Sequence, residues 1–222
     1  MAKAKKSENG KGTAEVLGIS PPNFKMAEFV IEGTTPYVQC KFSHKALEEM
    51  KATQEAGSQA KKGKKKEPKD FALCYEQAKH VSSDGWCGLP APGFRNAMIS
   101  ACKLVGFHMT KAKLAVFVEA DGFDRDDMSP LVKITTGEPE MSILPVRLAT
   151  GVIDLRARPL WQPGWRSTLR IKFDADQFSL QDCANLLTRV GEQVGIGEGR
   201  HDSKKSNGQG WGCFKILSEE EV

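Results

Sequence analysis

Two segments far apart in the sequence carry apolar side chains at helical spacing, and this pattern constrains the fold most strongly. The first segment follows Pro92, ends near Gly106 and carries the apolar stripe Phe94, Ala97, Met98, Ala101, Cys102 and Val105. The second follows Ser179, a residue type that favours the N-cap, and carries Leu180, Cys183, Ala184, Leu187, Val190 and Val194. Each stripe predicts a helix that buries one side against a sheet.

Strands are predicted on both sides of each helix. Alternation predicts half-buried strands over residues 37–43, 168–173 and 211–216, and an apolar run predicts a central strand over 114–118. Weaker strands are expected around 131–135, 143–148 and 152–157. The order strand, helix, strand, strand, helix, strand predicts an α+β, ferredoxin-like core, with large insertions after strand 1 and between strands 2 and 3.

The charge of the chain is concentrated in two segments. The formal net charge is +4, yet residues 1–12 alone carry +3 and residues 57–70 carry +4, while Glu219, Glu220 and Glu221 offset much of this near the end. We therefore expect a disordered basic arm (1–12), a single domain (13–218) with an inserted basic loop (57–70) and an insertion (120–166), and an acidic tail (219–222). The lysine segments suit loose contact with a polyanion, or serve only as solvated loops.

Neither a metal ion nor a cofactor is expected. The six cysteines lack the close pairs of a zinc site and read as free thiols in a reducing cytoplasm. The acidic cluster of Asp121, Asp124, Asp126 and Asp127 does not have calcium-loop spacing, so we expect a solvated turn. No apolar stretch approaches the ~20 residues of a membrane-spanning helix, and no secretory signal is expected, so we expect a cytoplasmic protein without a membrane partner.

The sheet face opposite the helices is the first candidate binding surface. If the alternation holds, this face carries two aromatic rings and several cations: Tyr37, Gln39, Lys41, Thr168, Arg170, Lys172, Trp211 and Lys215. Aromatic rings stack on unpaired bases and cations contact phosphates, so the set is typical of a nucleic-acid platform. The same outward-facing polar side chains are equally expected on any sheet that has one face in solvent.

A glycine-rich segment between the second helix and the closing strand is the second candidate. Residues 195–212 place glycines, among them Gly197 and Gly199, around a set of polar and basic side chains: Arg200, His201, Lys204 and Lys205. Glycine lets the backbone approach a ligand and expose amide donors, and no Walker triplet is present, so a polyanion backbone fits better than a nucleotide cofactor.

A third candidate lies in residues 155–166. Arg156, Arg158 and Arg166 would contact phosphates, and Trp161 and Trp165 either stack on bases or pack the insertion onto the core.

The layout resembles the RAMP superfamily of CRISPR-associated RNA-binding proteins, with the guide-RNA backbone subunits nearest. The likeness rests on the ferredoxin-like order and on Val194-Gly-Ile-Gly-Glu-Gly-Arg200 through Gly210-Trp-Gly-Cys-Phe214, an ending similar also to uncharacterised proteins of tailed bacteriophages. It covers about half of the chain. The resemblance implies single-stranded RNA or DNA as partner and homo-oligomers along the strand. It also implies a CRISPR-type or phage replication or recombination complex, in the host cytoplasm if the chain is phage-encoded.

The sequence therefore predicts a non-enzymatic single-stranded nucleic-acid-binding protein of a bacteriophage or mobile element. Two alternatives stay open: a RAMP-like, metal-independent endoribonuclease that uses His44 or His201, and a phage structural or assembly protein.

Overall fold

Two long antiparallel strands form the centre of the fold. The computed structural model describes residues 20–41, 44–56, 68–147, 153–202, 208–218 and 220–221. Strand β1 (Phe24–Gly33) pairs along its length with β9 (Arg166–Asp174). On the far side of β1 lies β10 (Phe214–Ile216), and on the far side of β9 lies β4 (Val116–Val118). The order across the centre is β10-β1-β9-β4, and each neighbouring pair is antiparallel.

Further strands join the sheet on the side of β9 where β4 pairs. Strand β6 (Pro130–Thr136) pairs with β9 where β9 begins, with Ile134 opposite Ser167. Strands β3 (Gly88–Pro90) and β5 (Gly122–Phe123) pair in turn with β6. Within the described residues these strands make one seven-stranded sheet.

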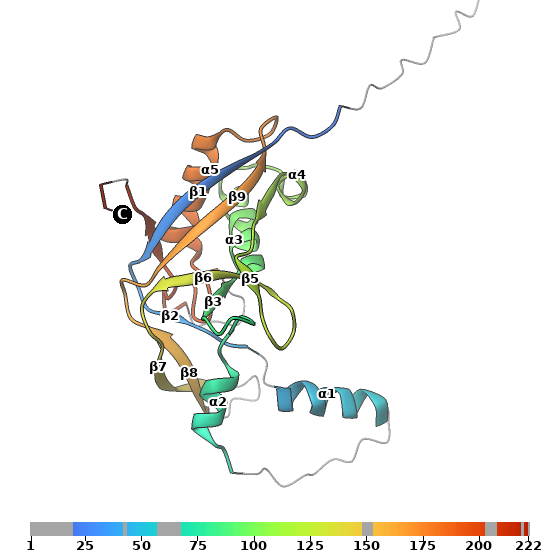
Figure 1. Cartoon of the computed structure of the whole chain (residues 1–222), viewed down its shortest axis with the longest axis vertical. Coiled ribbons are helices and arrows are strands. Elements are labelled where there is room, and N and C mark those ends of the chain that lie inside the picture. Colours follow the sequence, from blue (N-terminus) through green and yellow to red (C-terminus); the bar gives the residue numbers. More distant parts are fainter. Residues whose placement is uncertain are drawn as a thin grey trace, which may run out of the picture.

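Helices cover one face of this sheet, and Figure 1 shows α3 and α5 behind β1 and β9. They are α3 (Ala91–Leu104), α4 (Met109–Ala115) and α5 (Leu180–Arg189), which continues as the π-helical turn η2 (Val190–Val194). Their buried side chains form one core with the inward residues of the strands: Phe94, Met98, Cys102, Cys183, Leu187 and Val190 from the helices, and Ile31, Leu169, Ile171 and Phe173 from the sheet.

The two predicted helices are confirmed, and local chemistry explains their ends. Helix α3 has Pro92 in its first turn, where a missing backbone N–H costs nothing. Helix α5 begins at the N-cap Ser179, which forms a reciprocal capping box with Asp182. Each predicted apolar stripe includes one exposed residue at its end: Val105 at the end of the first and Leu180 at the start of the second.

A smaller sheet extends from the lower end of the body in Figure 1. Its order is β2-β8-β7, with β2 (Tyr37–Val38), β8 (Ile153–Trp161) and β7 (Glu140–Arg147). Helix α2 (Phe71–Gln77) packs on this sheet, and the side-chain hydroxyl of its Tyr75 donates to the carbonyl of Pro139 at 2.7 Å. Helix α1 (His44–Ala56) stands apart from the sheets.

The α+β class is confirmed, but the expected first strand is wrong. Within the described part of residues 37–43 only Tyr37 and Val38 are in a strand, and the long first strand is β1, which the alternation analysis missed. Residues 114–118 divide between the end of α4 and β4, and the closing strand is shortened to β10. The predicted basic arm, most of the basic loop and residues 219 and 222 lie outside the described residues.

The glycine at position 212 is required by the packing of two loops. Gly212 has φ +71° and accepts a hydrogen bond from the amide of Ile196, and a Cβ atom here would overlap the carbonyl oxygen of Ile196. We expect Gly212→Ala to lower the free energy of unfolding by about 3 kcal/mol, since the left-handed backbone strain and the overlap add. Urea unfolding followed by circular dichroism measures it.

Gly106 supplies the matched control for this prediction. It has φ +72° but open space around its Cα, so Gly106→Ala carries the backbone strain alone and should cost about 1 kcal/mol. Equal losses in the two variants would contradict the role of the loop contact.

Candidate nucleic-acid interface

The outer face of the sheet is set by the alternation of β9. Leu169, Ile171 and Phe173 are buried toward the helices, while Thr168, Arg170 and Lys172 lie on the opposite face. The predicted orientation of this strand is therefore confirmed. Lys215 of β10 also lies on this face, because it is opposite Glu32 of β1.

Acidic side chains of β1 change the charge of this face. The register places Glu32 opposite Arg166 and Glu28 opposite Arg170. Arg166 forms an ion pair with Glu32 at 2.7 Å, and Arg170 forms one with Asp121 at 2.6 Å. Each guanidinium thus already has a carboxylate partner within the chain, which lowers the net positive charge that this face presents to a phosphate.

The arginines of β8 are paired in the same way. Nε of Arg158 donates to Glu198 at 2.8 Å and Nε of Arg156 lies 3.7 Å from a carboxylate oxygen of Asp154. Arg158 pairs with a residue 40 positions away and Arg156 with one two positions away, and both side chains keep partial exposure. The predicted set of phosphate contacts is thus largely neutralised within the chain.

Tyr37 does not belong to a binding face. Its ring is 2% exposed and lies 5.5 Å from the ring of Trp161 and 5.6 Å from that of Trp165, centroid to centroid. Burial raises the pKa of its hydroxyl far above the ordinary range. The prediction that Tyr37 stacks on a base is wrong, and both tryptophans pack in the core, so the packing alternative for these rings is confirmed.

Lys41 is also withdrawn from solvent, in a cluster with Asp124 and His80. Nζ of Lys41 lies 2.5 Å from Oδ1 of Asp124 and 2.7 Å from Oδ2 of Asp126, while Nδ1 of His80 lies 3.0 Å from Oδ2 of Asp124. The carboxylate of Asp124 is fully buried. The expected solvated turn is therefore wrong at Asp124, and Lys41 serves this cluster.

The pKa values in the cluster follow from burial and from these hydrogen bonds. Burial alone would raise the pKa of Asp124, but hydrogen bonds from Lys41, from the Asp126 amide and from His80 outweigh it and lower the pKa. Burial would lower the pKa of Lys41, and its two carboxylate partners raise it. Burial lowers the pKa of His80 despite the opposing effect of Asp124.

The glycine-rich segment folds back on itself beside β2. The amide of Glu198 donates to the carbonyl of Val38 at 2.9 Å, and the amide of Gly212 donates to that of Pro36 at 2.8 Å. A Cβ atom at Gly197 would lie 2.6 Å from the Tyr37 ring, and one at Gly199 would overlap the ring of Trp211. These glycines are explained by the close packing of chain on chain.

Some side chains of the glycine-rich segment contact other residues of the chain, and others are exposed to solvent. Nη1 of Arg200 donates to the carbonyl of Gly197 at 2.9 Å, and Trp211 is half-buried in a turn rather than on a strand. His201 is exposed, with its ring beside Gly210. Lys204 and Lys205 lie outside the described residues.

An aromatic cluster at the other end of the outer face was missed by the sequence analysis. Phe24 and Met26 of β1 are 38% and 56% exposed, and Phe117 of β4 meets Phe24 edge to face with 5.8 Å between ring centroids. Nζ of Lys172 lies 4.9 Å from the centroid of Phe24, and the guanidinium of Arg95 lies 5.1 Å from that of Phe117. We call Phe24, Met26, Phe117 and Lys172 the aromatic end of the sheet.

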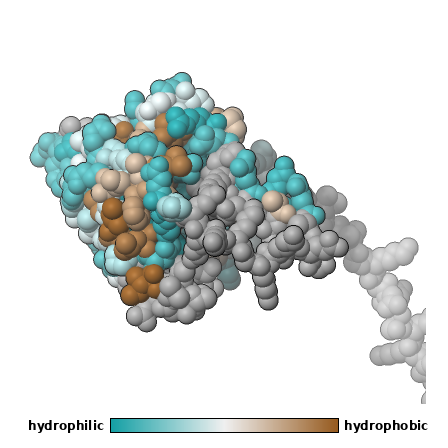
Figure 2. All heavy atoms as spheres, turned by 90° about the horizontal axis from the view of Figure 1, so that it is seen from below, coloured by the Kyte–Doolittle hydropathy of each residue, from teal (hydrophilic) through white to brown (hydrophobic). Residues whose placement is uncertain are grey.

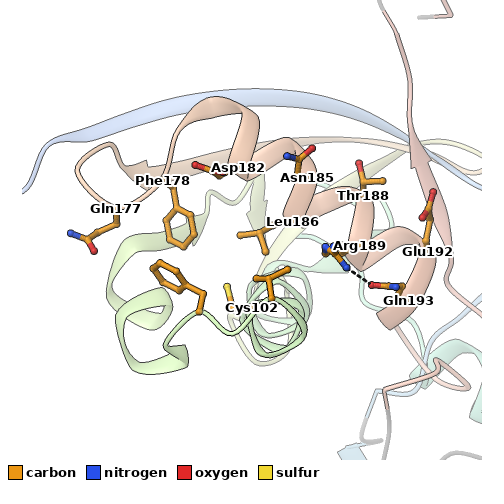
Figure 3. Close-up of a pocket in the computed structure, with 12 residues that line it drawn as sticks. Cys102, Gln177, Phe178, Asp182, Asn185, Leu186, Thr188, Arg189, Glu192 and Gln193 are labelled. Atoms are coloured by element: carbon orange, nitrogen blue, oxygen red, sulfur yellow. Dashed lines mark hydrogen bonds between the residues drawn. The ribbon is translucent and has the colours of Figure 1, made fainter.

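A groove of about 580 Å³ lies on the opposite side of the molecule, between α3 and α5. Figure 3 shows Phe178, Leu186 and Cys102 at its floor and polar side chains of α5 and η2 along its rim. Nη1 of Arg189 donates to Oε1 of Gln193 at this rim, at 3.2 Å. The groove is apolar inside and has mixed charge outside.

Comparison with models of known protein families gives no match, and no curated protein matches the sequence. In the described part of the chain no group of three or more His, Cys, Asp or Glu side chains is arranged to hold a metal ion. No helix found there has both the length and the apolar character needed to cross a bilayer.

The buried cluster predicts that acid destabilises the fold. Since His80 and Asp124 both have lowered pKa values in the folded chain, the unfolded chain binds protons first, and stability falls as pH drops below about 6.5 and again below about 3.8. Urea unfolding at a series of pH values measures this. His80→Gln should remove the first decrease, and His201→Gln, at an exposed position, is the matched control.

Removing one member of the buried pair should cost more than removing both. We expect Asp124→Asn to lower the free energy of unfolding by about 2–3 kcal/mol at neutral pH, because Lys41 would keep only the more exposed Asp126 as its carboxylate partner. Pairing it with Lys41→Met should recover part of the loss. A double variant no more stable than Asp124→Asn alone would contradict this coupling.

Proposed function

We propose that the protein binds single-stranded nucleic acid on the aromatic end of its sheet. The observation that carries the proposal is the exposed ring of Phe24 with the ammonium of Lys172 beside it on an open strand face. Base stacking on an aromatic ring is worth about 1–3 kcal/mol per base and needs no particular sequence. An adjacent lysine can meet the phosphate of the stacked nucleotide.

The strand order supports a ferredoxin-like core for this surface. In sequence, β1, α3, β4, β9, α5 and β10 follow strand, helix, strand, strand, helix, strand, and in space the four strands run β10-β1-β9-β4. The proposed core has both helices on one face and leaves the other face to a ligand. The segments 34–90 and 119–165 would then be the insertions.

The basic segments would add attraction without selectivity. Residues 1–12 and 57–70 together carry a formal charge of +7, whereas the arginines of the sheet are paired with carboxylates. We therefore propose that the lysine segments hold a polyanion loosely, while the aromatic end selects unpaired bases. We also propose that the protein is a RAMP-like protein of a phage or mobile element. The strand order and the glycine-rich segment support this part of the proposal.

The aromatic end predicts a loss of affinity when its ring is removed. Phe24→Ala should weaken binding of a single-stranded oligonucleotide by about 5- to 30-fold, the equivalent of about 1–2 kcal/mol. Phe123→Ala is the matched control, because Phe123 is 50% exposed on β5, away from this cluster. Fluorescence anisotropy with RNA, DNA and duplex measures it, with thermal unfolding to check each variant.

A salt series separates the aromatic end from the lysine segments. Lys172→Ala should reduce the slope of log affinity against log salt by about 0.7, the value for one phosphate contact on a single strand. Equal affinities for Phe24→Ala and Phe123→Ala, with binding abolished by deletion of 57–67, would overturn the proposed site.

A further inference from the structure

The β7–β8 hairpin carries an apolar face that extends beyond the body. The register places Met141 opposite Pro159, Ile143 opposite Ala157 and Pro145 opposite Leu155, so these residues share one face of the hairpin. Ala157 and Pro159 are buried near the body. Farther out, the apolar side chains are about half exposed.

We call the exposed residues of this face the arm face: Met141 (49% exposed), Ile143 (47%), Pro145, Ile153 (62%) and Leu155 (47%). Figure 2 views the molecule from below, the end where β7 and β8 lie in Figure 1, and shows apolar side chains gathered there. An apolar patch of several side chains on one face is typical of a protein interaction site, whereas scattered exposed side chains are ordinary.

The charges of the hairpin argue against nucleic acid as the partner here. Asp154 lies in an ion pair with Lys69, and Nε of Arg156 is 3.7 Å from its other oxygen. Asp154 and Arg156 alternate with Ile153 and Leu155, so these paired charges lie on the opposite face of the hairpin. None of the residues named in the arm face is charged, so a polyanion would find apolar side chains there instead of phosphate donors. Apolar composition with depleted charge is typical of the centre of a homodimer interface.

Strand β7 adds a reason to choose a second copy. Among the residues that the structure describes, β8 is the only strand paired with β7, so β7 (Glu140–Arg147) is the edge of its sheet. An exposed edge with an apolar face is a template for pairing with another strand. Two copies of β7 can pair antiparallel about a two-fold axis, which joins both arm faces into one surface.

We propose that two copies of the chain dimerise through β7 and the arm face. Ile143 lies near the middle of β7, so it meets its counterpart close to the two-fold axis, and Pro145 of each copy has no N–H to contribute to the main-chain pairing. The arm face supplies the apolar centre of this interface. The dimer does not depend on the proposed nucleic-acid site, which lies on the large sheet at the other end of the molecule.

Sedimentation velocity of the full chain, freed of nucleic acid and run from low to high micromolar concentration, tests the dimer. We expect a monomer–dimer equilibrium that Ile143→Glu and Leu155→Glu each weaken at least tenfold. Leu114→Glu is the control, because Leu114 is 72% exposed on α4, outside the arm face. A monomer at every concentration, or a dimer that persists in both arm variants, would overturn the proposal.

Cross-linking tests the two-fold geometry. In a Cys40→Ser background, which removes the exposed thiol, Ile143→Cys should oxidise to a covalent dimer far faster than Leu114→Cys. Equal rates would contradict pairing through β7. Since Phe24→Ala should leave the dimer intact and Ile143→Glu should leave the affinity for a short oligonucleotide unchanged, failure of either proposal is separable from failure of the other.

Discussion

The pairing of β1 with β9 is the contact on which the other elements depend. It joins residues about 140 positions apart, from Phe24 opposite Asp174 to Glu32 opposite Arg166. Each remaining strand of the centre attaches to one of these two: β10 to β1, and β4 and β6 to β9. The register also decides which side chains face outward together, so it creates the Arg166–Glu32 ion pair and places Phe24 and Met26 beside Lys172.

Local patterns predicted the helices and the orientation of β9, because both depend on residues close in sequence. The capping box of Ser179 and the alternation of Leu169, Ile171 and Phe173 needed no distant partner. Residues 37–43 failed for the opposite reason. Tyr37 and Gln39 are buried by contacts with Trp161 and Gly88, which lie far along the chain. The side chains that the local alternation predicted to face outward therefore face inward.

The candidate site was harder to predict than the fold, because the availability of a cation depends on its partner. Arg166, Arg170 and Arg158 each have a carboxylate supplied from a remote segment, and no spacing in the sequence reveals Glu32, Asp121 or Glu198 as those partners. The aromatic end had a local signal. Phe24 and Met26 alternate with Ala27 and Phe29 in a segment rich in strand-forming residues, which the periodicity analysis did not use.

The two exposed apolar surfaces differ in their chemistry, and this difference assigns them different partners. At the aromatic end a ring lies beside the ammonium of Lys172, an arrangement that suits a base with its phosphate. On the arm face the exposed side chains are apolar, while Asp154 and Arg156 pair on the opposite face of the hairpin. Such a surface gains free energy by excluding water against another apolar surface. Because the surfaces occupy opposite ends of the molecule, a dimer through β7 would leave both aromatic ends open, and one continuous strand could engage two copies at once.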